Sequence, residues 1–173
     1  MKPIHNRNFL PYKLKPVANN PKFRKMKPIH NGLSKYGRLY DWKTAKTVCP
    51  SGWHLPSNAE WSTLIRYVDN DKGCFLSCAG EHLKANSPLW NNTPFSNSNG
   101  KGTDYYGFSA LPGGSGHSNG SFDQAGDYGY WWTATESTAI DFYAYYMSMS
   151  SYTDVDGFSG DKSGLLSVRC LQD

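Results

Sequence analysis

Two cysteine-containing segments lie far apart in this sequence. Residues 49–56 read Cys-Pro-Ser-Gly-Trp-His-Leu-Pro and come just before a well-marked helix, whereas residues 167–170 read Ser-Val-Arg-Cys. If Cys49 and Cys170 pair, they close a loop around nearly the whole globular part, and a crosslink of that length contributes roughly 4–5 kcal/mol in the loop-entropy picture. Such a domain would join its first helix to its last strand and leave the middle free to form long loops.

The core has to be built mainly from aromatic rings. Of the 173 residues, 38% are hydrophobic and 15% are Trp, Tyr or Phe, so large rings replace much of the usual Leu and Ile. Twelve of the 17 glycines lie from Gly100 onward. Aromatic residues and glycines without helical spacing indicate short strands and many turns in this half of the chain.

Charge divides the sequence into two parts. Residues 1–46 contain 12 Lys or Arg and one acid, whereas residues 47–173 carry a net charge of −7. The basic part repeats the run Met-Lys-Pro-Ile-His-Asn, and proline after lysine favours extended backbone. We therefore expect residues 1–35 to form a basic tail or attachment arm, with a possible role in homo-oligomer assembly, and residues 36–173 to form one domain.

The partners and the location follow from what the sequence contains and lacks. No aromatic–basic platform accompanies the basic tail, so we do not expect nucleic acid as a partner. No apolar run is long enough to span a bilayer, and no signal peptide is visible. Disulfides would still point to an oxidising compartment, so we expect an extracellular, cell-surface or virus-particle location.

Local patterns predict helices first and strands afterwards. Ser57 and Glu60 fit a capping box, and apolar residues at helical spacing then continue to residue 67 or 68. A short helix is expected at residues 41–48. Strands are expected at residues 105–111, 129–135, 142–150 and 165–171, with loops at 86–104 and 115–128. This order indicates an α+β domain.

Five ordered blocks carry a family resemblance. They are Leu-Tyr-Asp-Trp (39–42), Cys-Pro-Ser-Gly-Trp-His-Leu-Pro-Ser-Asn-Ala-Glu-Trp (49–61), Gly-Phe-Ser-Ala-Leu-Pro-Gly-Gly (107–114), Gly-Tyr-Trp-Trp-Thr-Ala-Thr-Glu (129–136) and Ser-Val-Arg-Cys (167–170). Together they resemble the Fibrobacter succinogenes major paralogous domain family, which belongs to the wider C-type lectin-like fold. The resemblance covers about residues 36–173 and leaves the basic tail outside.

The resemblance implies a specific α+β architecture. It consists of two helices around a small twisted antiparallel sheet, with long loops and neighbouring ends. Cys49 and Cys170 match the usual disulfide of that fold. Cys74 and Cys78 do not match its core pattern, and a local disulfide, free thiols and a metal or redox site all stay open for them.

The calcium tripeptides of sugar-binding lectins with this fold, Glu-Pro-Asn or Gln-Pro-Asp together with Trp-Asn-Asp, do not occur here. Loop carboxylates that offer calcium ligands are Asp123, Asp127, Asp154, Asp156 and Asp161. Scattered aspartates of this kind usually form solvated turns. We therefore expect no cofactor, and calcium stays an unsupported alternative.

Residues 139–161, here called the late segment, have an unusual composition. The segment contains no Lys, Arg, Glu, Gln or Trp, and Tyr, Ser, Asp and Gly dominate it, as they do in antibody loops. The simpler interpretation is an ordinary strand pair with tyrosines on its solvent-exposed face. The sharper one is a ligand-binding surface, with Asp141, Tyr143, Tyr145, Tyr146, Tyr152, Asp154, Asp156 and Phe158 as contacts.

The genetic code suggests how such a surface would arise. Diversity-generating retroelements mutate adenines, so that Asn codons ending in a pyrimidine become Tyr, Asp, Ser, Phe, Gly and related residues, but never Met, Lys, Glu, Gln or Trp. All 23 residues of the late segment except Met147 and Met149 lie in the reachable set. The variable proteins of these elements resemble this chain in carrying a C-type lectin-like domain with variation near its C-terminus.

We therefore expect a non-enzymatic domain that binds a protein or glycan on a cell surface. The alternatives are an extracellular structural or adhesive domain and, third, a formylglycine-generating-type enzyme. That enzyme class shares the broad fold and an Arg-Cys ending but needs a reactive cysteine pair. We expect no catalytic residue, and His54 is expected to be a packing residue.

Overall fold

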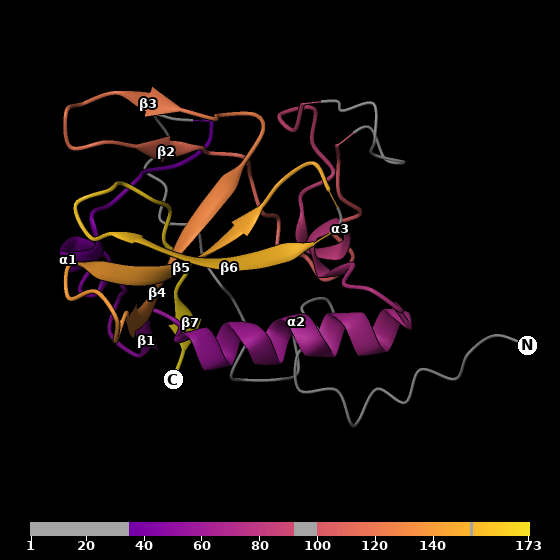
Figure 1. The fold of residues 1–173 in the computed structure, drawn as a ribbon. Coiled ribbons are helices and arrows are strands. Elements are labelled where there is room, and N and C mark those ends of the chain that lie inside the picture. Colours follow the sequence, from indigo (N-terminus) through magenta and orange to yellow (C-terminus); the bar gives the residue numbers. More distant parts are fainter. Residues whose placement is uncertain (1–34, 92–99, 153) are drawn as a thin grey trace, which may run out of the picture.

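The computed structural model describes residues 35–91, 100–152 and 154–173, which form an α+β structure with short helices and small antiparallel sheets (Figure 1). Nearly all of the expected basic tail, residues 1–35, and part of the expected loop 86–104 lie outside the described residues. In chain order the elements are α1 (Trp42–Ala45), β1 (Trp53–His54), α2 (Asn58–Lys72), α3 (Ala79–Leu83), β2 (Ser115–Gly116), β3 (Phe122–Asp123), β4 (Gly129–Glu136), β5 (Tyr143–Met149), β6 (Val155–Asp161) and β7 (Leu171–Gln172).

Local side-chain chemistry sets both ends of α2. The Ser57 hydroxyl accepts from the Glu60 N–H, and the Glu60 carboxylate accepts from the Ser57 N–H, as the capping box predicted. The helix passes the predicted end and stops at Gly73, which is left-handed with φ 66°. The sequence pattern missed this last turn because its residues are polar. The buried residues of the helix are Trp61, Leu64, Tyr67 and Val68.

The central sheet contains β4, β5 and β6 in that order, all antiparallel. Its first face packs on α2 in a core that includes Trp131, Met147 and Met149. Its second face contributes Trp132 and Ala144 to a separate core with α1. Figure 1 shows α2 along one side of this sheet and the β2–β3 hairpin beyond the other.

The two ends of the domain are tied together. A disulfide joins Cys49 to Cys170 across 121 residues of sequence, with their Cα atoms 5.7 Å apart. Immediately beside it, β1 pairs antiparallel with β7. A second disulfide joins Cys74 to Cys78 after α2, so the structure contains the local disulfide in place of free thiols.

The prediction of a strand at residues 105–111 is wrong. Tyr106, Phe108 and Ala110 are buried in alternation, which mimics a strand pattern. The backbone instead turns repeatedly, because Gly107 and Ser109 have φ values of 70° and 55°. An extended strand does not visit this left-handed region.

Other boundaries also differ from the prediction. Only Leu171 of the expected last strand, 165–171, joins a ladder, where it pairs in β7 together with Gln172, and Leu165, Leu166 and Ser167 make isolated bridges instead. The pattern did not predict α3 or β6, and the expected loop 115–128 contains the β2–β3 hairpin. The strands expected at 129–135 and 142–150 are present as β4 and β5.

Candidate functional site

The late segment forms the β5–β6 hairpin and the turns around it. Seven residue pairs join the two strands, from Tyr143 opposite Asp161 to Met149 opposite Val155. Four of the eight exposed large apolar side chains among the described residues belong to this segment. They are Ile140, Phe142, Tyr152 and Phe158, with exposed fractions of 38%, 61%, 52% and 50%.

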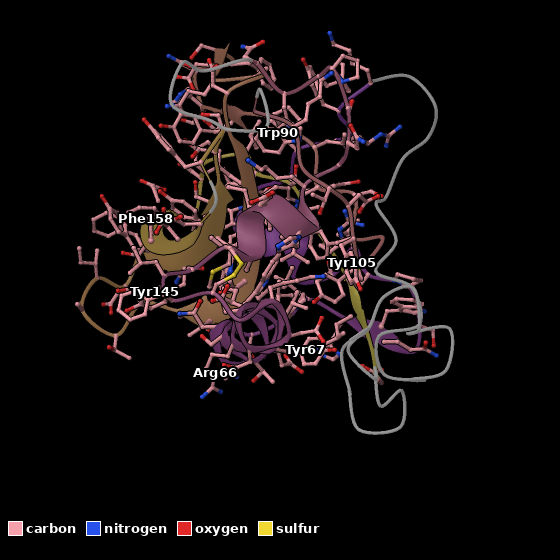
Figure 2. The ribbon with its side chains drawn as sticks, turned by 90° about the vertical axis from the view of Figure 1, so that its right-hand side faces the viewer. Arg66, Tyr67, Trp90, Tyr105, Tyr145 and Phe158 are labelled. Carbon is pink, nitrogen blue, oxygen red and sulfur yellow. A yellow bond between two sulfur atoms is a disulfide. The ribbon has the colours of Figure 1, made fainter. Side chains whose placement is uncertain are left out.

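The predicted contact residues divide between the two faces of the hairpin. Tyr143 and Tyr145 alternate with Met147, so they share the face that packs on α2, and both are half-buried. Tyr146 lies on the second face, where its ring meets Phe158 at a centroid distance of 6.0 Å. Figure 2 shows Tyr145 and Phe158 along one side of the molecule, away from Tyr105. The eight predicted residues therefore do not form one patch.

The remaining four predicted residues occupy turns and the edge strand. Asp141 and Tyr152 are exposed in the turns that flank β5, and Asp154 and Asp156 are exposed around the start of β6. Burial, with a smaller effect from the charge of Asp154, raises the pKa of Asp156. These four side chains extend the surface along the hairpin.

Besides the late side chains that enter the two cores, main-chain hydrogen bonds hold the late segment to the rest of the domain. The Lys162 Nζ donates to the Asp141 carbonyl at 2.6 Å, and the Thr133 hydroxyl donates to the Tyr145 carbonyl at 3.0 Å. Backbone amides of Lys162 and Ser137 donate to the carbonyls of Phe142 and Tyr143. A carbonyl oxygen is the same in every residue type, so these anchors do not depend on the late side chains.

Lys84 provides a buried anchor with two acceptors. It is only 1% exposed, and its Nζ donates to the carbonyls of Ser150 and Tyr152, both at 2.7 Å. Burial lowers the pKa of this ammonium to about 8, against the opposing charges of Glu81 and Asp154. The lysine fixes the path of the turn that displays Tyr152.

A pocket of about 240 Å³ lies between the second face of the hairpin and the β2–β3 hairpin. Tyr130, Trp132 and Tyr146 supply its aromatic wall. The Tyr146 ring is nearly perpendicular to the other two, with interplanar angles of 85° and centroid distances of 5.7 and 6.0 Å. Gly160 and Asp161 also line it, so the pocket is lined both by the late segment and by residues outside that segment.

Polar groups from the β2–β3 region form the other wall. The Tyr130 hydroxyl donates to Gln124 Oε1 at 2.7 Å, and burial, followed by nearby Tyr and Asp123 groups, raises the pKa of Tyr130 to about 12. His117 Nε2 lies 2.9 Å from an Asp123 oxygen, and Ser115 donates to the other oxygen at 3.0 Å. These bonds lower the pKa of Asp123, which keeps it ionised.

Sequence reasoning missed most of this pocket. The alternation of Tyr130 and Trp132 in a predicted strand was the one usable signal, because residues two apart share a face. His117 and Gln124 lie in a segment that carried only loop character. Their position depends on packing between elements far apart in the sequence.

The described geometry offers few arrangements for catalysis or metal binding. Ser115 donates to Asp123 rather than to His117, whereas an activated serine needs the imidazole as its base. All four cysteines are in disulfides.

Among the described residues, one group of three possible metal ligands gathers, formed by Asp69, Cys74 and Cys78. The disulfide removes its two thiolates, which metal binding requires. The five aspartates considered for calcium do not form such a group there.

His54 links two distant parts of the framework. Its Nδ1 lies 2.6 Å from Asp173 Oδ1, and its Nε2 lies 3.1 Å from Glu60 Oε1. Burial opposes protonation of the ring, but the two carboxylates outweigh it and raise the pKa of His54. The ring therefore joins Glu60, in the first turn of α2, to Asp173, the residue after β7.

The sequence of this chain matches the family model of the Fibrobacter succinogenes major domain over residues 7–172. The chain belongs to the Fibrobacter succinogenes major domain family. The match begins earlier than residue 36, where the five motif blocks placed the start of the resemblance. No curated protein and no solved structure shows significant similarity to this family member. No helix in its described part is long and apolar enough to cross a membrane.

Proposed function

We propose that this chain is a non-catalytic recognition domain that contacts its ligand through the late segment. The ligand is a protein or glycan on a cell surface. The surface consists of the exposed and half-buried side chains of the β5–β6 hairpin and its turns. Tyrosine suits this role because it offers a large, rigid and amphipathic contact area at a small entropic cost.

The burial of two methionines carries the proposal. Met147 and Met149 are the only late residues that adenine mutagenesis of Asn codons cannot produce, and they are 3% and 0% exposed in the α2 core. Every exposed position in the segment has a residue from the reachable set. Variation limited to the surface, with a constant core, would give this pattern.

The main-chain anchors support the same proposal. Lys84, Thr133 and Lys162 reach carbonyl oxygens of the late segment, so its side chains can change while its backbone stays in place. We accordingly propose a C-type lectin-like fold in which a diversity-generating retroelement varies the hairpin. The two disulfides favour an oxidising location outside the cell or on a virus particle.

Two matched libraries test this proposal. In the first, the full chain is displayed on yeast with Tyr145, Tyr152, Asp154, Asp156 and Phe158 randomised. In the second, five exposed or half-exposed positions of α2 are randomised: Ala59, Ser62, Thr63, Arg66 and Asn70. Both libraries are selected against hen lysozyme, a protein probe unrelated to any expected ligand. We expect the first library to remain displayed and to yield binders far more often than the second.

Equal yields from the two libraries, or loss of display in the first alone, would contradict the proposal. The retroelement is tested separately by DNA sequence. A near-identical template repeat beside the gene, differing from it only at adenines, is the expected finding. Sibling sequences that drift uniformly, with no such repeat, would remove the retroelement from the account.

A further inference from the structure

The aromatic wall of the pocket forms a corner rather than a flat platform. Tyr146 meets Tyr130 and Trp132 at near right angles. Tyr128 stacks on Tyr130 with an interplanar angle of 4°, which fixes that ring from outside the pocket. Trp132 is 1% exposed, so it closes the corner without offering a broad open face. Such a corner suits a compact, rounded group better than a flat one.

The charges around the pocket are acidic. Asp161 lines it, and the ionised Asp123 is bonded to His117 and Ser115, which also line it. No Lys or Arg lies among the residues that line the pocket. An anionic ligand would therefore meet unfavourable charge, whereas a cation would meet the Asp161 carboxylate and the negative faces of aromatic rings, with Asp123 behind the lining residues His117 and Ser115.

We propose that this pocket binds an alkylammonium group, of the size and charge of a trimethylammonium. This inference rests on the proposed recognition function and names the chemistry at one part of the surface. Aromatic rings attract such cations through their quadrupoles, and closely spaced rings are the usual way to recognise a quaternary ammonium. Because Tyr146, Gly160 and Asp161 belong to the late segment, variation there would alter this specificity.

A neutral sugar ring is the competing ligand chemistry. It needs a flat aromatic face and several polar groups that can reach its hydroxyls. Here Gln124 Oε1 already accepts from Tyr130, and His117 already contacts Asp123. The polar wall is therefore engaged in internal hydrogen bonds, which favours the cation.

The test is an NMR titration of the full chain with small-molecule probes, in which binding is monitored through the Tyr and Trp signals. The probes are choline, its uncharged isostere 3,3-dimethyl-1-butanol, and methyl glucoside. We expect choline to bind saturably and about tenfold more tightly than the isostere, because only choline gains the cation–π attraction. Equal binding of choline and the isostere, no saturable binding of choline, or preferential binding of the glucoside would overturn the proposal.

Variants locate the binding in the pocket. We expect Tyr146→Phe, which keeps the ring, to bind choline within about twofold of the native chain, and Tyr146→Leu to lose about tenfold. Tyr105→Leu, at an exposed tyrosine outside both the late segment and the pocket lining, is the matched control and should bind normally. If Tyr146→Leu does not fold, Gly160→Ala replaces it, because the added methyl would lie 3.1 Å from Tyr146 Cε1 and should weaken binding.

Normal choline binding by the folded Tyr146→Leu or Gly160→Ala chain would contradict the pocket assignment. The library experiment is independent of this one. Binders in the hairpin library together with no choline binding would remove the ammonium proposal and leave the recognition proposal intact.

Discussion

β4 and β6 flank the same central strand but are stabilised in different ways. In β4, Trp131 and Trp132 are 3% and 1% exposed and enter the two cores on opposite faces of the sheet. In β6, Val155 is the one buried residue, and the other six are exposed or half-exposed. β6 is therefore positioned mainly by its backbone ladder to β5, whereas β4 is positioned by its side chains as well.

This difference distinguishes the side chains that specify the fold from those that are free to contact a ligand. An aromatic pair on β4 determines where the sheet lies, and the cost of changing it is large. A side chain on β6 can change at little cost, because exposed substitutions usually shift stability only slightly. The predictions below compare the frame, meaning the described residues outside the late segment, with the β5–β6 hairpin.

Removing the disulfide of the frame should have the largest effect. Because Cys49 and Cys170 are separated by 121 positions in the sequence, the double variant Cys49→Ala/Cys170→Ala should lose about 4–5 kcal/mol of stability. Denaturant unfolding measures this loss, and the Cys74→Ala/Cys78→Ala pair is the control with a much shorter loop. A smaller loss at the long disulfide than at the short one would show that the frame does not depend on this crosslink.

Truncating one ring on each flanking strand compares them directly. Trp132→Ala should cost about 3–5 kcal/mol, because it removes a nearly fully buried ring from a core. Phe158→Ala should cost less than about 1 kcal/mol, because its ring is half-exposed. Urea unfolding of both variants gives the two values. Similar losses would mean that β6 is also part of the packed framework.

Replacing Lys84 should release the hairpin turn from the frame. Lys84→Met should cost about 2 kcal/mol at pH 7, because two partly buried carbonyls lose a charged donor. Amide hydrogen exchange should also accelerate around Ser150 and Tyr152. Unchanged exchange in this turn would show that the lysine does not position it.

The same variant carries a pH signature. The pKa of Lys84 is lowered from 10.5 to about 8 in the folded chain, so between these values the unfolded state binds more protons. Native stability relative to Lys84→Met should therefore rise with pH from about 8 to 10.5. A constant difference across this window would contradict the lowered pKa.

Helices α1 and α2 and strands β4 and β5 were predictable because their signals are local. Ser57 and Glu60, three positions apart, form a capping-box pattern that indicates a helix start, and the consecutive Trp131 and Trp132 indicate a buried strand. β6 gave no such signal, because Gly157, Gly160 and two Asp residues have low strand propensity and rely on pairing with β5. The pocket was unpredictable for a related reason: His117 and Tyr146 meet only through tertiary packing.

Replacing His54 should have the smallest effect on stability, and it tests the frame alone. Its pKa is raised above 6.5 in the folded chain, so its contribution is complete below pH 6.5 and is lost as pH rises through the folded value. The stability difference between the native chain and His54→Asn should shrink from pH 5.5 to 8, by less than about 1 kcal/mol, because the pair is partly exposed. A difference that grows with pH would reverse the assignment.

The most direct test of the central claim is the unfolding free energy of a chain with its hairpin surface rewritten. Tyr152, Asp154, Asp156 and Phe158 are all replaced by Asn, and the comparison variant is Met149→Ala in the core. We predict that the fourfold variant stays within about 2 kcal/mol of the native chain, whereas Met149→Ala alone loses about 2–5 kcal/mol. A fourfold variant that unfolds, beside a Met149→Ala chain of native stability, would contradict the account.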